Sequence, residues 1–200
     1  MRDMGHEDTV VLHSAYFPSV GWYRTSLSAP ELVLDEEEFF VRKSSRNRFL
    51  VCGPNGTVKL TVPLEGGRNQ HSRMKDLKIA QGGRWPVIHW RTLEACYGRA
   101  PFFLHYAPAL EPLLVHPPRF LMDAQLQALD CIDRSFRVDR TVIRGGREGK
   151  VEADPQAGVA GLHYLQPFAE RHGFVNGLSV LDLLLCCGPA GIGLLPPYCS

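Results

Sequence analysis

The residue types best suited to chemistry gather in one short stretch of the chain. The segment 42–48 reads R-K-S-S-R-N-R, so four cations fall within seven residues, directly after the acidic run 35–38. If this stretch is extended, its side chains alternate between two faces, and one face carries Glu38, Arg42, Arg46 and Arg48. Three guanidinium groups on one face form a bidentate surface for phosphate or carboxylate. The alternative interpretation is a solvated edge strand whose charges oppose aggregation.

A second candidate, His89, lies in a helix predicted from Pro86 to about Tyr97. At 100° per residue, the apolar face of this helix carries His89, Trp90, Leu93, Cys96 and Tyr97, and Trp85 lies just before it. An inward histidine among aromatic side chains is either a hydrogen-bonded core residue or a general base. The periodicity is compatible with both interpretations.

The elements that must position these residues begin with two short strands. Thr9 to His13 reads T-V-V-L-H, and Glu31 to Asp35 reads E-L-V-L-D, with a predicted helix from about 20 to 28 between them. A helical crossover makes the two strands parallel. Ligands bind at the loops that follow such strands, which places His13 and Tyr16 among the substrate-binding candidates. A hydrogen-bonded strand-end histidine is the alternative interpretation of His13.

The remaining pattern predicts an α/β fold, with α+β as the alternative. Asn55-Gly56 predicts a hairpin between strands 48–52 and 57–62, and helices are expected at about 86–97, 101–114, 119–136, 162–171 and after Ser179. We therefore expect an N-terminal mixed sheet with a hairpin, followed by a mostly helical C-terminal half packed on it. Residues 1–200 are expected to form a single domain. Residues 144–161 contain five glycines and no apolar periodicity, which indicates a flexible linker or flap.

Two serines are predicted helix caps. Ser19 precedes the first helix, and Ser179 precedes the last one. Asp182 follows Ser179 in the S-x-x-D spacing of a capping box, which gives this aspartate a structural role.

The composition excludes several classes of protein and partner. A net charge of +1 gives no general attraction to nucleic acid or to an anionic membrane. The chain has neither a signal-peptide pattern nor an apolar run of the roughly 18 residues that a membrane span needs, which predicts a soluble cytoplasmic protein. The six cysteines form no CxxC pair and the histidines have no compact spacing, so we expect reduced thiols and no metal. No nucleotide-binding or hydrolase motif is present, and the sequence assigns no cofactor.

An ordered set of motifs runs through nearly the whole chain. The longest are L-H-S-A-Y-F-P-S-V-G-W-Y (12–23), E-x-F-x-R-x-S-x-R-N-R (38–48), N-G-x-x-x-L-T-V-P (55–63), W-x-x-x-H-W (85–90), P-F-F-L-H-Y (101–106) and the tail R-H-G-F-V-N-G-L-S-V-L-D-L-L-L-C-C-G-P (171–189). Together they resemble the WbqC-like family of bacterial proteins. Where many relatives have lysine, this chain has Arg42, which keeps the charge but removes an amine nucleophile.

The resemblance implies a link to bacterial surface-polysaccharide (O-antigen) gene clusters and a transferase acting on amino sugars. It adds weight to Glu38, Arg42, Arg46, Asn47, Arg48, Trp85, His89 and Asp182. The leading hypothesis is a cytoplasmic enzyme that transfers a small group to a nucleotide-linked or phosphorylated sugar. The competing hypothesis is a non-catalytic binding or scaffold protein of a polysaccharide assembly complex, with the charged segment as its docking surface.

The leading hypothesis assigns a role to each candidate residue. Phosphates are held by Arg42, Arg46 and Arg48, and Asn47 orients a hydroxyl or amide. Trp85 and Trp90 form the walls of the sugar site, and His89 or Glu38 is the general base. The basic segment and the helix 86–97 are then expected to meet at one cleft.

Overall fold

Three parallel strands form the first sheet of the protein. The computed structural model describes residues 9–66, 71–146 and 159–195. In it, β2 (Glu31–Asp35) lies between β1 (Thr9–His13) and β5 (Thr141–Gly145). The predicted parallel pairing of β1 with β2 is confirmed, and it sets His13 opposite Asp35. The carboxyl ends of both strands therefore open at the same edge of the sheet.

The third strand, β5, was not predicted. The predicted flexible segment 144–161 contains Arg144 and Gly145, but these two residues complete β5 beside β2. Of the rest of that segment, residues 147–158 lie outside the described residues. The strand reads T-V-I-R-G and is only five residues long, too short for its periodicity to stand out from the glycines that follow.

The predicted hairpin is confirmed as a separate, two-stranded antiparallel sheet. It consists of β3 (Arg48–Gly53) and β4 (Gly56–Thr61), with Arg48 opposite Thr61. Pro54 and Asn55 form its two-residue turn. Gly56 has a φ of 103°, a conformation that glycine adopts without a Cβ clash.

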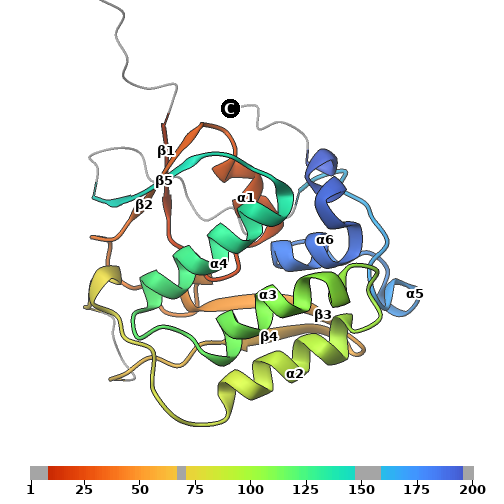
Figure 1. Ribbon diagram of the computed structural model, residues 1–200, viewed down its shortest axis with the longest axis horizontal. Coiled ribbons are helices and arrows are strands. Elements are labelled where there is room, and N and C mark those ends of the chain that lie inside the picture. Colours follow the sequence, from red (N-terminus) through yellow and green to blue (C-terminus); the bar gives the residue numbers. More distant parts are fainter. Residues whose placement is uncertain (1–8, 67–70, 147–158, 196–200) are drawn as a thin grey trace, which may run out of the picture.

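Helices cover both sheets. Their bounds are α1 (Val20–Ser26), α2 (Trp85–Tyr97), α3 (Phe103–Val115), α4 (Leu121–Phe136), α5 (Ala169–His172) and α6 (Val180–Cys187), with short 3₁₀ helices η1 (Ser45–Asn47), η2 (Met74–Asp76) and η3 (Gly188–Leu194). In Figure 1, α2 and α3 lie along the hairpin, and α4 lies between them and the parallel sheet. The packing of α2 on β3 and of α3 on both α2 and α4 agrees with this view. The fold is mixed α/β, as predicted, with most of the helix in the C-terminal half.

The amphipathic helix α4 packs as its sequence predicts. Its buried residues include Leu121, Met122, Leu129, Ile132 and Phe136, whereas Gln127, Asp130 and Arg134 are exposed. Burying this stripe removes apolar surface from water, which is the main driving force for the docking of such a helix.

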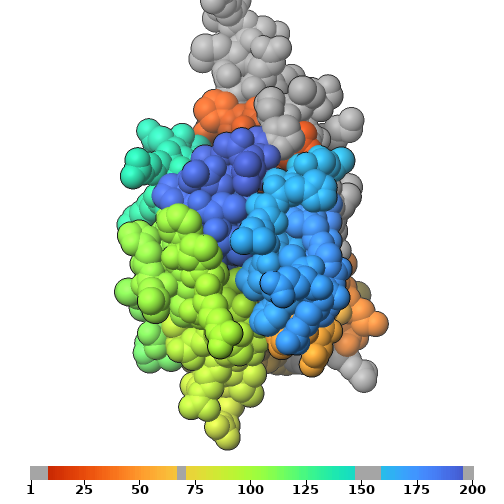
Figure 2. All heavy atoms as spheres, turned by 90° about the vertical axis from the view of Figure 1, so that its right-hand side faces the viewer, coloured from red at the N-terminus to blue at the C-terminus, as the bar shows by residue number. Residues whose placement is uncertain are grey.

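The helix predicted at 162–171 is largely absent. Only α5, four residues long, forms there, after Pro167 and a left-handed Phe168 (φ 61°). The preceding residues are held by side-chain hydrogen bonds instead: Gln166 Nε2 donates to Val175 O at 2.9 Å, and Val175 N donates to Gln166 Oε1 at 2.7 Å. Figure 2 shows this segment, in light blue, lying against α6 in dark blue.

Candidate functional site

The charged stretch does not continue as an extended strand, so the predicted common face of Glu38 and the three arginines is wrong. After β2, Asp35 Oδ1 accepts hydrogen bonds from Glu37 N at 2.9 Å and Glu38 N at 3.1 Å, which starts a turn. Lys43 is left-handed (φ 61°), and Ser44 caps η1 by accepting from Arg46 N. The three arginines consequently enter three different environments.

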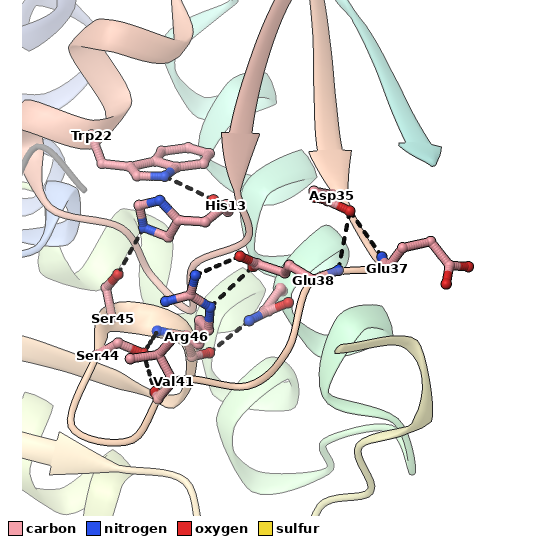
Figure 3. Close-up of polar contacts among 10 residues, drawn as sticks. His13, Trp22, Asp35, Glu37, Glu38, Val41, Ser44, Ser45 and Arg46 are labelled. Atoms are coloured by element: carbon pink, nitrogen blue, oxygen red, sulfur yellow. Dashed lines mark hydrogen bonds and ion pairs between the residues drawn. The ribbon is translucent and has the colours of Figure 1, made fainter. Parts of the chain in front are cut away.

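Arg46 is held in a buried ion pair. Its Nε donates to Glu38 Oε1 at 3.0 Å and its Nη2 to Glu38 Oε2 at 2.5 Å, and the two side chains are only 10% and 13% exposed (Figure 3). Gln125 of α4 also fixes the Arg46 backbone by donating to its carbonyl oxygen at 2.6 Å. A bidentate pair of this kind satisfies both partners, so this contact is a structural link between the loop after β2 and η1.

Arg42 and Arg48 are placed differently from Arg46. Arg42 is exposed, in the turn before η1. Arg48, half-buried at the start of β3, lines a cavity of about 260 Å³. Its Nε is buried and has no hydrogen-bond partner among the described residues. A buried guanidinium nitrogen without a partner is costly in a folded protein, and a water, an ion or a ligand can supply the acceptor for such a group.

We refer to this hollow as the cationic cavity. Its wall consists of Phe17, Ser19, Lys43, Ser44, Ser45, Arg48, Phe49, Leu50, Lys59, Gly177 and Ser179. Three of these side chains are cations and four carry hydroxyls, and no described residue of the wall is a carboxylate. The three cations offer an anion charge-assisted donors from several directions.

Two helix starts meet at the wall of the cationic cavity. Ser19 caps α1, as predicted, by accepting from Trp22 N at 3.1 Å, and Ser179 caps α6 by accepting from Leu181 N at 3.3 Å. Their backbones are joined, because Val20 N donates to Leu178 O and Val180 N donates to Pro18 O. The N-terminal loop and the C-terminal helix thus close one side of the cavity.

His13 and Tyr16 lie beside this wall rather than in it. His13 Nε2 is 3.1 Å from Ser45 Oγ, and Trp22 Nε1 donates to the His13 carbonyl oxygen at 3.0 Å (Figure 3). Tyr16 N donates to Ser45 O, and its ring packs against Phe49 at 5.7 Å between ring centroids. Burial raises the pKa of the Tyr16 hydroxyl, whose oxygen has no partner among the described residues.

His89 packs behind Phe49. Its ring centroid lies 6.0 Å from that of Phe49 and 5.1 Å from that of Trp85, and the side chain is 4% exposed. Burial lowers the pKa of His89 to about 4, against a smaller opposing effect of a hydrogen bond with the Thr61 backbone. Phe49 contacts both the histidine and the cationic cavity, but His89 is not among the residues that line the cavity. Its role as a general base stays a prediction.

The other predicted residues are spread over neighbouring sites. Trp85 lines a separate hollow of about 350 Å³ next to Gly82 and Gly83, whereas Trp90 stacks on Phe103 at 5.8 Å. Asn47 is buried and donates from Nδ2 to Val62 O at 2.8 Å. The structure therefore brings Arg48 to the cationic cavity, with His13 and Tyr16 beside it, and leaves both tryptophans out of its wall.

Asp182 does not complete a capping box. Ser179 caps α6 alone, and the fully buried Asp182 carboxylate accepts from Tyr97 Oη at 2.7 Å, Tyr164 Oη at 2.6 Å and Gln166 Nε2 at 2.7 Å. Burial raises the pKa of Asp182, and these three hydrogen bonds lower it in part. The carboxylate joins α2, α6 and the segment from residue 159 through these tertiary contacts, in place of the predicted cap.

Of the residues that line the cavity, only Arg48 had been predicted as a ligand contact. The polar wall residues that sequence reasoning missed are Ser19, Lys43, Ser44, Ser45, Lys59 and Ser179. Ser45 stands in the family-like motif 38–48, at a position that the motif leaves variable. Lys59 precedes the buried Leu60 on β4, one face of which is solvent-exposed, and an exposed lysine is common on such a strand. Only the strand pairing brings it opposite Leu50, near Arg48.

The described ranges contain no trio of His, Cys, Asp or Glu placed to hold a metal ion. In the same ranges, every helix is too short or too polar to span a membrane.

Comparison with known proteins agrees with the motif pattern. The model of the WbqC-like protein family matches residues 13–160. The chain belongs to the WbqC-like protein family. This WbqC-like chain is also similar to "Uncharacterized protein Rv1507c" of Mycobacterium tuberculosis (strain ATCC 25618 / H37Rv), with 26% identity over 103 residues, 52% of this chain and 44% of that protein. The match thus spans less than half of that relative. No solved structure matches the chain.

Proposed function

We propose that this WbqC-like protein is an enzyme of bacterial surface-polysaccharide biosynthesis that transfers a small group to a phosphorylated or nucleotide-linked sugar. The phosphate of that sugar binds in the cationic cavity, where Arg48 is the principal contact and Lys43 and Lys59 add charge. Arg46 and Glu38 hold the loop that forms the wall. Asn47 and Tyr16 support the wall from behind.

The observation that carries this proposal is the buried Arg48 Nε without a protein acceptor, in a wall of cations and hydroxyls that lacks carboxylates among its described residues. Paired surface arginines serve stability or solubility, but a half-buried arginine at a cavity gains most from an anionic ligand. The volume of about 260 Å³ lies just below the roughly 300–1,000 Å³ of small-molecule sites. A concave wall of this kind favours a small ligand over the flat contact of a scaffold protein.

Titration calorimetry with a matched panel tests the proposal. The panel contains inorganic phosphate, a sugar phosphate, a nucleotide-linked amino sugar and the same amino sugar without phosphate. We expect binding of the phosphorylated members only, and Arg48→Ala should weaken it by about 1.5–3 kcal/mol, roughly 10- to 150-fold. Arg134→Ala is the control, because Arg134 is exposed on α4 and pairs with Asp130. Equal binding by Arg48→Ala, or no binding of any phosphorylated member, would contradict the proposal and favour a docking role.

A further inference from the structure

One serine of the cationic cavity is in contact with a histidine ring. Ser45 Oγ lies 3.1 Å from His13 Nε2, and His13 is 2% exposed behind the wall that Ser45 forms. With the ring proton on Nδ1, Nε2 accepts a hydrogen bond from the serine hydroxyl. Separations of about 2.6–3.2 Å are those between a histidine base and the serine nucleophile that it activates.

Both partners are fixed by contacts outside the pair. Trp22 Nε1 donates to the His13 carbonyl oxygen at 3.0 Å, and the two rings meet edge to face with centroids 6.4 Å apart. Tyr16 N donates to the Ser45 carbonyl oxygen at 3.1 Å, which ties η1 to the loop after β1. The pair is therefore preorganised by two segments of the chain, so little ordering is needed when a substrate arrives.

The other cavity serines have different partners. Ser44 Oγ donates to Val41 O at 2.6 Å, and Ser179 Oγ donates to Phe17 O at 2.9 Å. Ser19 Oγ accepts from Trp22 N as the cap of α1. Ser45, by contrast, contacts the basic side chain of His13.

We propose that Ser45 is the nucleophile and His13 the general base of an acyl transfer at the cationic cavity. The inference rests on the proposed function for its acceptor, and it specifies the small group as an acyl group. The donor is an activated acyl ester or thioester. Arg48, which faces the same cavity, supplies positive charge for the oxyanion that forms during attack.

The reaction takes place in two balanced steps. Ser45 Oγ forms a bond to the acyl carbon, its proton moves to His13 Nε2, and the carbon–oxygen or carbon–sulfur bond of the donor breaks. The leaving group departs with the proton from His13. In the second step, a hydroxyl or amine of the sugar attacks the acyl-serine, His13 takes its proton, and the same proton returns to Ser45 Oγ as the ester bond breaks. No oxidant or reductant is required.

Acylation by p-nitrophenyl acetate tests the dyad without the natural donor or acceptor. The full-length protein is mixed with the ester, release of p-nitrophenolate is followed by absorbance, and the acetylated residue is located by peptide mass spectrometry. We expect a burst of product and one acetyl group on Ser45. Ser45→Ala should lose both, and His13→Gln should slow the burst by about 10²–10⁴-fold. Ser135→Ala on α4, whose hydroxyl donates to Cys131 O, should behave as the wild type.

A further variant keeps the test decisive if His13→Gln does not fold. Ser45→Cys places a stronger nucleophile at the same position, and we expect it to form a thioester. Acetylation of Ser45→Cys without acetylation of the wild type would mean that the hydroxyl is not activated, which overturns the inference. Acetyl groups on Lys43 or Lys59 and none on Ser45, or an unchanged burst in Ser45→Ala, would overturn it as well.

Binding and acylation are measured on the same samples, so the two proposals fail separately. Acetylation of Ser45 without phosphate-dependent binding would support the Ser45–His13 dyad and contradict the phosphorylated acceptor. If Arg48→Ala weakens phosphate-dependent binding but Ser45 is not acetylated, the result would support the ligand site and contradict the dyad.

Discussion

Arg46, within η1, and Arg48, just after it, lie in opposite environments. Arg46 is buried against Glu38 with both of its hydrogen bonds to the carboxylate satisfied, whereas Arg48, two residues later, faces a cavity without a protein acceptor for its Nε. The backbone separates them, because residues 45–47 turn as a 3₁₀ helix before β3 begins. Under the proposed function, two similar residues in one motif therefore serve architecture and ligand binding respectively.

The largest effect that tests this comparison is expected for Glu38→Ala. It leaves Arg46 buried without its partner, and we expect the free energy of unfolding to fall by about 3–5 kcal/mol. Urea denaturation measures the change. Asp130→Ala is the matched control, because it breaks an exposed pair with Arg134 and should cost no more than about 0.5 kcal/mol. A loss below about 1 kcal/mol for Glu38→Ala would mean that the Arg46 pair is not architectural.

His89 adds a third case to this comparison, because its burial disfavours the protonated, charged form of the ring. Burial lowers its pKa in the folded state to about 4, below the unfolded value of 6.5. The unfolded state therefore binds more protons between these pH values, and the stability contributed by neutral His89 is lost as the pH falls through this window. We expect this loss to be about 3 kcal/mol.

Denaturant unfolding at pH values from about 7 to 4 separates this contribution from other titrating groups. His89→Gln should lose less stability over this range than the wild type does. His105→Gln, which replaces an exposed ring on α3, should follow the wild-type curve. Identical pH profiles for His89→Gln and the wild type would show that His89 is not buried in its neutral form.

Lys59→Ala tests how far the cavity depends on its exposed rim. Because Lys59 is exposed, solvent screens its charge, and we expect phosphate-ligand binding to weaken by only about 0.5–1 kcal/mol. Calorimetry at low and high salt should show the difference shrinking as salt rises. Arg91→Ala, an exposed cation on α2 that does not line the cavity, is the control. A loss as large as that of Arg48→Ala would place the main anion contact at Lys59.

The smallest expected effect concerns the backbone at Lys43. Its φ of 61° is strained for a residue with a Cβ, and strain of this kind gathers at ligand sites. Lys43→Gly relieves the strain but removes a cavity cation, so stability should change by no more than about 1 kcal/mol while ligand binding weakens. Lys43→Asn keeps a residue that tolerates this conformation and should weaken binding equally. Unchanged binding in both variants would remove Lys43 from the site.

Local patterns predicted the elements whose causes are local. Asn55-Gly56 indicates the hairpin, Ser19 specifies a cap, and the apolar stripe of α4 specifies which face is buried. Each of these signals acts over a few residues, because turn chemistry, capping and amphipathicity are properties of neighbouring side chains. The ordered motifs likewise identified the family, and they pointed to the segment that forms part of the cavity wall.

Only the tertiary structure decided which motif residues meet and which partners they take. Pairings across the chain hold Ser45 against His13, Asp182 against Tyr97, and β5 beside β2. The side chains of the arginines enter different environments because Lys43 is left-handed and residues 45–47 form one turn of 3₁₀ helix. The alternation predicted for an extended chain does not account for these two features. The sequence by itself determined where the charges stand along the chain. Long-range packing determined which of them are satisfied by the protein, because burial and pairing partners are set by segments far apart in sequence.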